Sequence, residues 1–133
     1  MPGEPERRIG SGLVLLLGVG RDDDAAAAGR LAAKVARMRV FEDESGRFAR
    51  SLLDVGGEAL VVSQFTLLAD SKRQRGTRPD FSQAAPRGEA EPIYEAFCDA
   101  LRSHAIRVKT GVFAARMEVE LVNDGPVTLI LEA

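Results

Sequence analysis

A short apolar run near the start of the chain most constrains its fold. Residues 13–17 read Leu-Val-Leu-Leu-Leu, and Gly18-Val19-Gly20 follows directly. A run this short, bounded so closely by glycines, favours a strand over a helix. We therefore expect residues 13–17 to form a buried, central strand of a sheet.

The next segment is predicted to be an amphipathic helix. Leu31, Val35 and Met38 recur at spacings of four and three, which places them on one helix face. The acidic triplet at residues 22–24 precedes this stripe, where aspartate side chains cap free backbone N–H groups. The triplet is interpreted as the N-terminal cap of the helix.

A second amphipathic helix is predicted from a spacing of four between Ile93, Phe97 and Leu101. Pro92 suits the first turn of such a helix, because the missing N–H would have no partner there. His104 is expected at the far end of the helix.

Three further strands are expected. Residues 59–67 are rich in strand formers and follow the Gly56-Gly57 turn. The C-terminal third alternates between apolar and polar residues, which is typical of strands with one buried face. The apolar positions of the two C-terminal strands are Met117, Val119 and Leu121, followed by Val127, Leu129 and Leu131.

Polar turns separate these segments, at residues 42–46 and 123–126, and a loop is expected over residues 70–86. Strands outnumber helices and short turns join adjacent strands, so the pattern predicts an α+β fold. We expect a mixed, largely antiparallel sheet with two main helices, in a single domain spanning residues 1–133.

Composition narrows the class of protein further. The chain has 133 residues, with 18 Lys and Arg against 20 Asp and Glu, and 45% of its residues are hydrophobic. These values are typical of a globular domain, and no apolar run approaches the ~18 residues of a membrane-spanning helix. The N-terminal segment also lacks a secretory signal pattern, so a cytoplasmic protein without a membrane partner is expected.

Two residue types that supply much enzyme chemistry are nearly absent. Cys98 is the only cysteine and His104 the only histidine, which excludes an internal disulfide and a zinc cage of thiolates and imidazoles. Cys98 is interpreted as a buried packing residue and His104 as a surface residue favoured by the helix dipole. No metal or other cofactor is expected.

Two glycine-containing segments were weighed as binding loops. Gly18-Val19-Gly20 lies between a strand and a helix, but it lacks the third glycine of a dinucleotide fingerprint and is followed by three aspartates. Nucleotide binding is therefore a distant alternative. In contrast, residues 71–79 carry four cations and no anions, which fits either a solvated loop or contact with phosphates. These cations are Lys72, Arg73, Arg75 and Arg78.

Two polar motifs remain open to structural or functional interpretation. Ser63-Gln64-Phe65-Thr66 could aim hydroxyl, amide and backbone N–H groups at a ligand, or simply end a strand. Asn123-Asp124-Gly125-Pro126 could be an ordinary turn, although a Gly-Pro bond can also fix carbonyls in an unusual direction.

Taken together, the motifs resemble those of the D-aminoacyl-tRNA deacylases, which hydrolyse D-amino acids from mischarged tRNA. The similarity extends in order from Gly12 to Leu131. It includes both polar motifs, which match the family's signatures. The matching stretches, two of which contain these motifs, are residues 15–19, 41–43, 53–57, 61–67, 78–79, Phe81 and 121–128.

The resemblance implies a family-specific α+β homodimer with a sheet that is barrel-like. It also implies that Ser63, Gln64, Phe65 and Thr66 line the pocket for the aminoacylated terminal adenosine. Because Thr66 has no adjacent base, we favour attack by water, assisted by the ribose 2′-hydroxyl. The backbone N–H groups of Phe65 and Thr66 are the oxyanion candidates.

The resemblance further implies how one enantiomer is selected. Gly125 and Pro126, as a cis pair, would enter the partner subunit's pocket and leave no room for an L side chain, so D-aminoacyl and glycyl esters would be cleaved. Phe113 and Met117 match pocket-side positions of the family. The four cations of residues 71–79 would contact tRNA phosphates.

Some positions depart from the family pattern. The family's first strand, with an arginine that supports the Gly-Pro loop, has no counterpart here, and Ala49, Asp80 and Arg116 replace the usual residues. A catalytically weakened RNA-binding homodimer of the same fold is therefore the alternative hypothesis.

Overall fold

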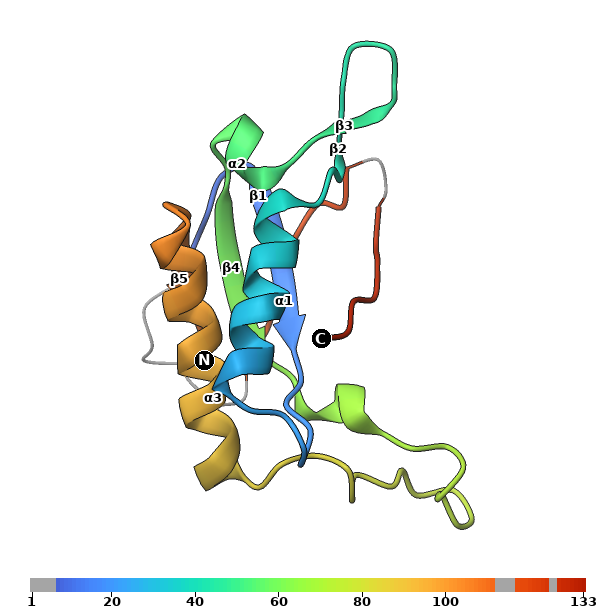
Figure 1. Ribbon diagram of the computed structural model, residues 1–133. Coiled ribbons are helices and arrows are strands. Elements are labelled where there is room, and N and C mark those ends of the chain that lie inside the picture. The colour runs from blue at the N-terminus through green and yellow to red at the C-terminus, as the bar shows by residue number, and fades with distance from the viewer. Residues whose placement is uncertain (1–6, 112–116, 125–126) are drawn as a thin grey trace.

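The computed structural model describes residues 7–111, 117–124 and 127–133 (Figure 1). The labels η1 and α2 denote a 3₁₀ turn and a single short helical turn. In chain order the elements are β1 (Gly12–Leu17), α1 (Ala25–Arg37), β2 (Phe41–Glu42), β3 (Phe48–Arg50), α2 (Leu52–Val55), β4 (Glu58–Ser63), η1 (Phe65–Leu68), α3 (Arg87–Ser103) and β5 (Arg107–Thr110).

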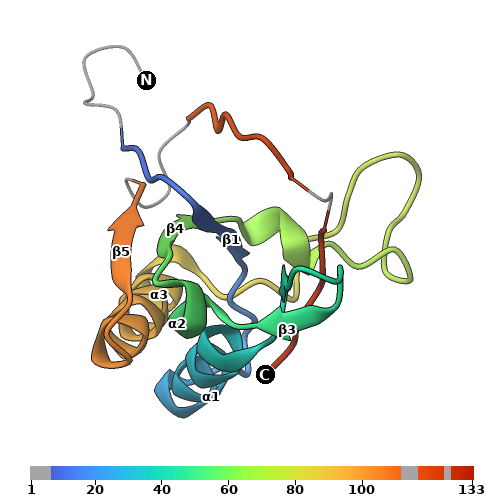
Figure 2. The ribbon, with the colours of Figure 1, turned by 90° about the horizontal axis from the view of Figure 1, so that it is seen from above.

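The main sheet has the strand order β1-β4-β5, and both pairings are parallel. The predicted strand at residues 13–17 is confirmed, but it forms one edge of this sheet, with β4 at the centre. The long helices α1 and α3 lie side by side on one face of the sheet (Figure 2). The mixed α+β class and the two main helices are thus confirmed.

The prediction of a largely antiparallel sheet is wrong for the described residues. Only the short pair β2 and β3 is antiparallel. The reason is that β1, β4 and β5 are linked through helices, which carry the chain back to the starting edge and make the strands parallel. The described strands form an open sheet and not the closed, barrel-like one that the resemblance implied.

The two predicted C-terminal strands are also not formed. Residues 117–124 and 127–133 are extended chain without a strand ladder among the described residues. Alternating apolar residues favour a strand only where a neighbouring strand accepts its hydrogen bonds. The end of the chain is instead held by packing, since Leu131 contacts the core and Lys34 Nζ donates to the Glu132 carbonyl at 3.1 Å.

The predicted helices begin and end for recognisable reasons. Asp24 is the N-cap of α1, and its carboxylate accepts the Ala27 N–H at 2.8 Å, so the acidic cap is confirmed. His104 is the C-cap of α3, as expected. Pro92 lies in the second turn and not the first, because α3 begins at Arg87. The carbonyl that Pro92 leaves without a helical donor belongs to Gly88, which is exposed to solvent.

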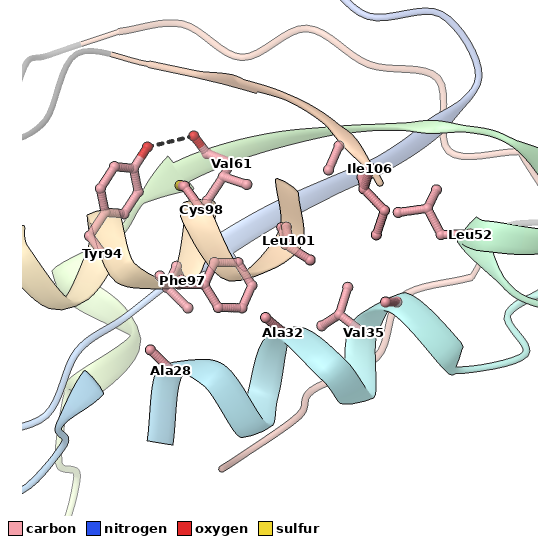
Figure 3. Packing of buried hydrophobic residues seen from close by; sticks show 13 residues of the cluster. Ala28, Ala32, Val35, Leu52, Val61, Tyr94, Phe97, Cys98, Leu101 and Ile106 are labelled. Carbon is pink, nitrogen blue, oxygen red and sulfur yellow. Dashed lines mark hydrogen bonds between the residues drawn. The ribbon is translucent and has the colours of Figure 1, made fainter. Parts of the chain in front are cut away.

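The core fills the space between the helices and the inner face of the sheet (Figure 3). Phe97 and Leu101 of α3 are almost fully buried against Ala32 and Val35 of α1. Val61 of β4 adds the sheet side of this cluster. Within the described part of the chain, no helix is long and apolar enough to span a membrane.

Candidate functional site

The candidate site lies where the parallel strands end. β1 ends at Leu17 and β4 at Ser63, and these two residues are register partners. β5 ends at Thr110, beside Val61 of β4. In sheets with parallel strands, ligands bind beyond the carboxyl ends, where loops diverge from a fixed edge. The predicted Ser63-Gln64-Phe65-Thr66 motif emerges from the central strand at this edge.

The prediction of a strand over residues 59–67 is wrong beyond Ser63, because the rest of the motif does not continue β4. The Gln64 N–H still donates to the Leu17 carbonyl at 2.8 Å, but from Phe65 the chain tightens into η1. The strand stops because β1 and β5 have both ended and offer no further partners. Phe65 and Thr66 consequently lie on an exposed turn, with 58% of Phe65 accessible to solvent.

The turn leaves two backbone donors available. The N–H of Leu67 donates to the Gln64 carbonyl and that of Ala69 to the Thr66 carbonyl, at 3.2 Å each. The N–H groups of Phe65 and Thr66, by contrast, have no hydrogen-bond acceptor among the described residues. Two adjacent N–H groups on an exposed turn can bind one oxygen that carries negative charge.

The Thr66 hydroxyl has a single described partner. Gln64 Nε2 donates to Thr66 Oγ1 at 2.5 Å. His104, the sole imidazole, lies at the C-terminal end of α3 and not beside Thr66. The hydroxyl therefore lacks the adjacent base that activates a threonine nucleophile.

An aromatic pair forms one side of the turn. The Phe65 and Phe81 rings are 5.0 Å apart between centroids and inclined at 72°, an edge-to-face arrangement. Such pairs stabilise by about 0.5–1.5 kcal/mol beyond the area they bury. Phe81 begins the segment that leads to α3, so the pair ties the exposed turn to that segment.

Met117 lies beside Gly111, which follows the end of β5. A Cβ placed on Gly111, just beyond β5, would come within 2.6 Å of Met117 Cε, so the thioether packs directly on this glycine. The Gly111 N–H donates to the Val61 carbonyl at 3.3 Å. The predicted site residues Phe113, Gly125 and Pro126 lie outside the described residues.

The flanks of the Gly125-Pro126 motif are joined by one side chain. Asn123 Oδ1 accepts the Val127 N–H at 3.1 Å, and Asn123 Nδ2 donates to Thr128 Oγ1 at 2.9 Å. Asn123 thus links the two ends of the motif through its amide.

Comparison with known proteins decides the family. The model of the D-Tyr-tRNA(Tyr) deacylase family matches residues 2–132. The chain belongs to this family. The D-aminoacyl-tRNA deacylase of Thermomicrobium roseum is 57% identical over 125 residues, which cover 94% of this chain and 80% of that relative. The Geobacillus enzyme of the same name is 56% identical, over 98% of this chain and 85% of that relative.

Two solved structures have a similar fold. A structure titled c-Myc DNA Unwinding Element Binding Protein has a TM-score of 0.84 and 41% identity, and the match covers 94% of this chain and 84% of that one. A probable eukaryotic D-amino acid tRNA deacylase has a TM-score of 0.60 at 16% identity, over 77% and 74% of the two chains, which shows likeness of fold.

The basic loop of this deacylase family member lies next to η1. Residues 71–79 are all exposed, as a solvated loop requires. Arg73 pairs with Asp70 at 3.2 Å, whereas Lys72, Arg75 and Arg78 pair with no carboxylate in the described part of the chain. Asp70 also holds the first turn of the loop through the Lys72 N–H at 3.0 Å. These three cationic side chains are therefore available to bind an anionic partner.

Sequence reasoning missed one polar feature of the deacylase core. The Tyr94 hydroxyl is buried and donates to the Val61 carbonyl at 2.8 Å, which ties α3 to the central strand (Figure 3). Beside it is a hollow of about 310 Å³, lined in part by Cys98, Asp99 and Arg102. Burial raises the pKa of the Cys98 thiol, so the packing role predicted for this cysteine is the consistent one. A single buried tyrosine on a helix gives no sequence signal for its partner.

No group of three or more His, Cys, Asp or Glu side chains that could hold a metal ion occurs in the described ranges. The features that converge on the carboxyl edge of the sheet are thus backbone donors, an amide, hydroxyls, aromatic rings and a neighbouring cationic loop.

Proposed function

We propose that the exposed turn Ser63 to Thr66 is where this D-aminoacyl-tRNA deacylase hydrolyses the ester bond of its substrate. The products are a free D-amino acid and tRNA. The observation that carries the proposal is the pair of N–H groups on Phe65 and Thr66, which lack acceptors at an exposed turn beyond the central strand. These two N–H groups would donate hydrogen bonds to the substrate oxygen that becomes negatively charged in the transition state.

The reaction needs no nucleophilic side chain, because an aminoacyl ester is already activated. A water oxygen bonds to the ester carbonyl carbon, and the carbonyl electron pair moves onto the oxygen held by the two N–H groups. That electron pair then re-forms the carbonyl as the bond to the ribose 3′-oxygen breaks, and the leaving oxygen takes up the proton that the attacking water has lost. One oxyanion donor contributes about 10² to 10³ in rate in other hydrolases.

Water activation is assigned to the substrate itself. The ribose 2′-hydroxyl lies beside the ester in every aminoacyl-tRNA and can orient the attacking water. The Thr66 hydroxyl accepts a hydrogen bond from the Gln64 amide and has no base beside it. A tRNA ending in 2′-deoxyadenosine, aminoacylated on its 3′-oxygen, should therefore bind normally and be hydrolysed much more slowly.

We assign selection between enantiomers to Gly125 and Pro126 of the partner subunit, which would exclude the L side chain from the pocket. Carbonyls fixed close to the substrate α-carbon would leave no room for an L side chain, while D-residues and glycine would fit. Glycyl-tRNA is thus a second proposed substrate. Phe113 and Met117 would line the pocket on the side of β5.

A homodimer is the assembly that this arrangement needs, and exposed apolar side chains near the Gly125-Pro126 motif support it. Val122 and Ile130 are each 91% exposed, and Leu121 and Leu129 are more than half exposed. Apolar groups concentrated in this way are typical of surfaces that meet another protein. The mass of the protein in solution tests this part of the proposal.

The tRNA itself is proposed to contact the basic loop. Lys72, Arg75 and Arg78 would neutralise backbone phosphates, and Arg73 would join them by exchanging its carboxylate partner. Contacts of this kind position a nucleic acid without reading its bases. The proposed place of action is the cytoplasm, where aminoacyl-tRNA is made and used.

The alternative is a catalytically weakened RNA-binding homodimer of the same fold, which the free charges of the basic loop would also suit. A measurement of turnover distinguishes the active deacylase from the weakened binder. The purified chain is given D-tyrosyl-tRNA and L-tyrosyl-tRNA in parallel, and its mass is measured in the same sample. Selective release from the D substrate by a dimer is expected.

A Gly125→Ala variant provides the chiral control, because an added methyl group at the excluding surface should change the ratio of D to L hydrolysis. Binding of tRNA with no release from either substrate would instead support the weakened binder.

A further inference from the structure

The segment Gly18 to Arg21, which follows β1, is not explained by the proposed chemistry. In the structure it runs between two other segments, η1 on one side and residues 81–85 on the other. Both of these segments carry aromatic rings of the candidate site. The inference drawn here rests on the proposed function of that site.

Gly18 allows η1 to approach closely. A Cβ at this position would collide with the Leu68 Cδ2 atom, and it would lie 3.1 Å from Leu67 Cβ and 3.2 Å from the Gln64 carbonyl oxygen. The last two distances are tighter than ordinary van der Waals contact. A methyl group at position 18 therefore requires the Leu68 side chain to move away and η1, which begins one residue after Gln64, to shift by a few tenths of an ångström.

The other side of the segment is held by hydrogen bonds. The Ala85 N–H donates to the Val19 carbonyl at 2.9 Å, and the Arg21 N–H donates to the Gln83 carbonyl at 3.0 Å. The Arg21 guanidinium adds a bond from Nε to the Ser82 carbonyl. An isolated bridge between Gly20 and Ala84 completes the pairing.

We propose that Gly18 and Arg21 are positioning residues for ester hydrolysis. Gly18 sets the distance from the end of β1 to η1, and Arg21 holds the segment that begins at Phe81. Together they fix the Phe65 ring against Phe81 and orient the N–H groups of Phe65 and Thr66. Neither residue touches the reacting atoms in this account.

The test of Gly18 compares Gly18→Ala with Gly29→Ala. A Cβ on Gly29, which lies within α1, would meet no heavy atom within 4 Å, so the control adds the same methyl group without a collision. Displacement of a site by about 1 Å can cost 10²-fold in rate. We expect Gly18→Ala to lower kcat by up to about tenfold, with KM for D-tyrosyl-tRNA unchanged, whereas Gly29→Ala should keep the original kcat and have a slightly higher melting temperature, because alanine favours a helix interior.

A second substitution makes the test specific to the geometry. Leu68→Ala removes the Cδ2 atom that the new methyl group would strike. The double variant Gly18→Ala with Leu68→Ala should recover much of the lost kcat, relative to Leu68→Ala alone. A loss that Leu68→Ala does not relieve, or a Gly18→Ala enzyme with the kcat of Gly29→Ala, would overturn the role of Gly18.

The test of Arg21 compares Arg21→Ala with Arg30→Ala, which removes an equally exposed charge from α1. We expect a lower kcat, an unchanged KM and an unchanged dependence of binding on salt for Arg21→Ala. A higher KM with unchanged kcat would show that Arg21 binds tRNA, and would overturn its positioning role.

A third variant, Thr66→Pro, tests the proposed site itself, because it deletes one of the two assigned donors. If Thr66→Pro were folded and fully active, the site would be wrong. If it were inactive while Gly18→Ala and Arg21→Ala kept normal kcat, only the positioning inference would fail.

Discussion

Removal of the Thr66 hydroxyl, without removal of its N–H, separates backbone from side-chain catalysis. Thr66→Val keeps the shape of the residue and its backbone donor. The one described interaction lost is the hydrogen bond from Gln64 Nε2, and both residues have access to water. A hydrogen bond of this kind contributes about 0.5–1.5 kcal/mol, and 1.4 kcal/mol corresponds to a factor of ten. The expected loss in kcat/KM is therefore at most about tenfold.

Thr66→Pro removes the backbone donor as well. It deletes the N–H, which has no acceptor in the described part of the chain, together with the hydroxyl that accepts from Gln64 Nε2, so Thr66→Val, which loses only the hydroxyl, is its control. Proline is tolerated at positions in the first turn of a helix because the N–H that it lacks would have no acceptor there. If the N–H stabilises the oxyanion, the expected loss in kcat is about 10² to 10³.

The assay is release of D-tyrosine from D-tyrosyl-tRNA under single-turnover conditions, with tRNA binding and melting temperature measured for each variant. Thr66→Ala is the second variant without a hydroxyl and guards against an effect of the branched valine. If Thr66→Val and Thr66→Ala both lost all chemistry while tRNA binding stayed intact, the assignment to backbone donors would be refuted and the hydroxyl would be the catalytic group.

Three further outcomes are expected. Arg75→Gln and Arg78→Gln should each weaken tRNA binding and reduce the slope of log affinity against log salt by about 0.7–0.9, whereas Arg30→Gln on α1 should not; equal slopes would count against phosphate contact. The Asp54 carboxylate accepts the Ser51 N–H at 2.8 Å in the capping box at the start of α2, and this interaction with Ser51 lowers the pKa of Asp54 in the folded state. Its stabilisation is therefore present above the unfolded pKa of about 3.9 and is lost as pH falls through the folded value, so urea titrations should show a flatter acid limb for Asp54→Asn. Ala105 has a φ of 64°, and Ala105→Gly should raise the free energy of unfolding by about 0.5–1 kcal/mol; a lower melting temperature would contradict this.

Much of the local structure follows from the sequence. The aspartate cap of α1, the helical stripe containing Phe97 and the strand that begins the fold are set by neighbours only a few residues away. The same is true of what the chain lacks, since one cysteine and one histidine exclude most nucleophile and zinc chemistry whatever the fold. The residue types of Ser63-Gln64-Phe65-Thr66, directly after an apolar strand, left open a ligand site or a plain strand end, and only the family resemblance implied a place in the pocket.

The direction of strand pairing could not be obtained in this way. Alternation of apolar residues specifies which face of a strand is buried, but a parallel and an antiparallel neighbour bury it equally well. The parallel order β1-β4-β5 depends on how α1 and α3 pack against the sheet and against each other. The C-terminal segments show the same limit, because an alternating pattern without a partner strand makes no ladder.

The sequence by itself determined the family, the helices, the missing side-chain chemistry and the residues of the proposed catalytic motif, because each is a property of residue type or of near neighbours. Only the tertiary structure decided how these parts meet. The ends of β1 and β4 coincide, the chain then turns at Phe65, and two N–H groups lose their partners as a result. The reason for a glycine at position 18 also lies in the tertiary structure, since the atoms that crowd a side chain there belong to residues some fifty positions further along the chain.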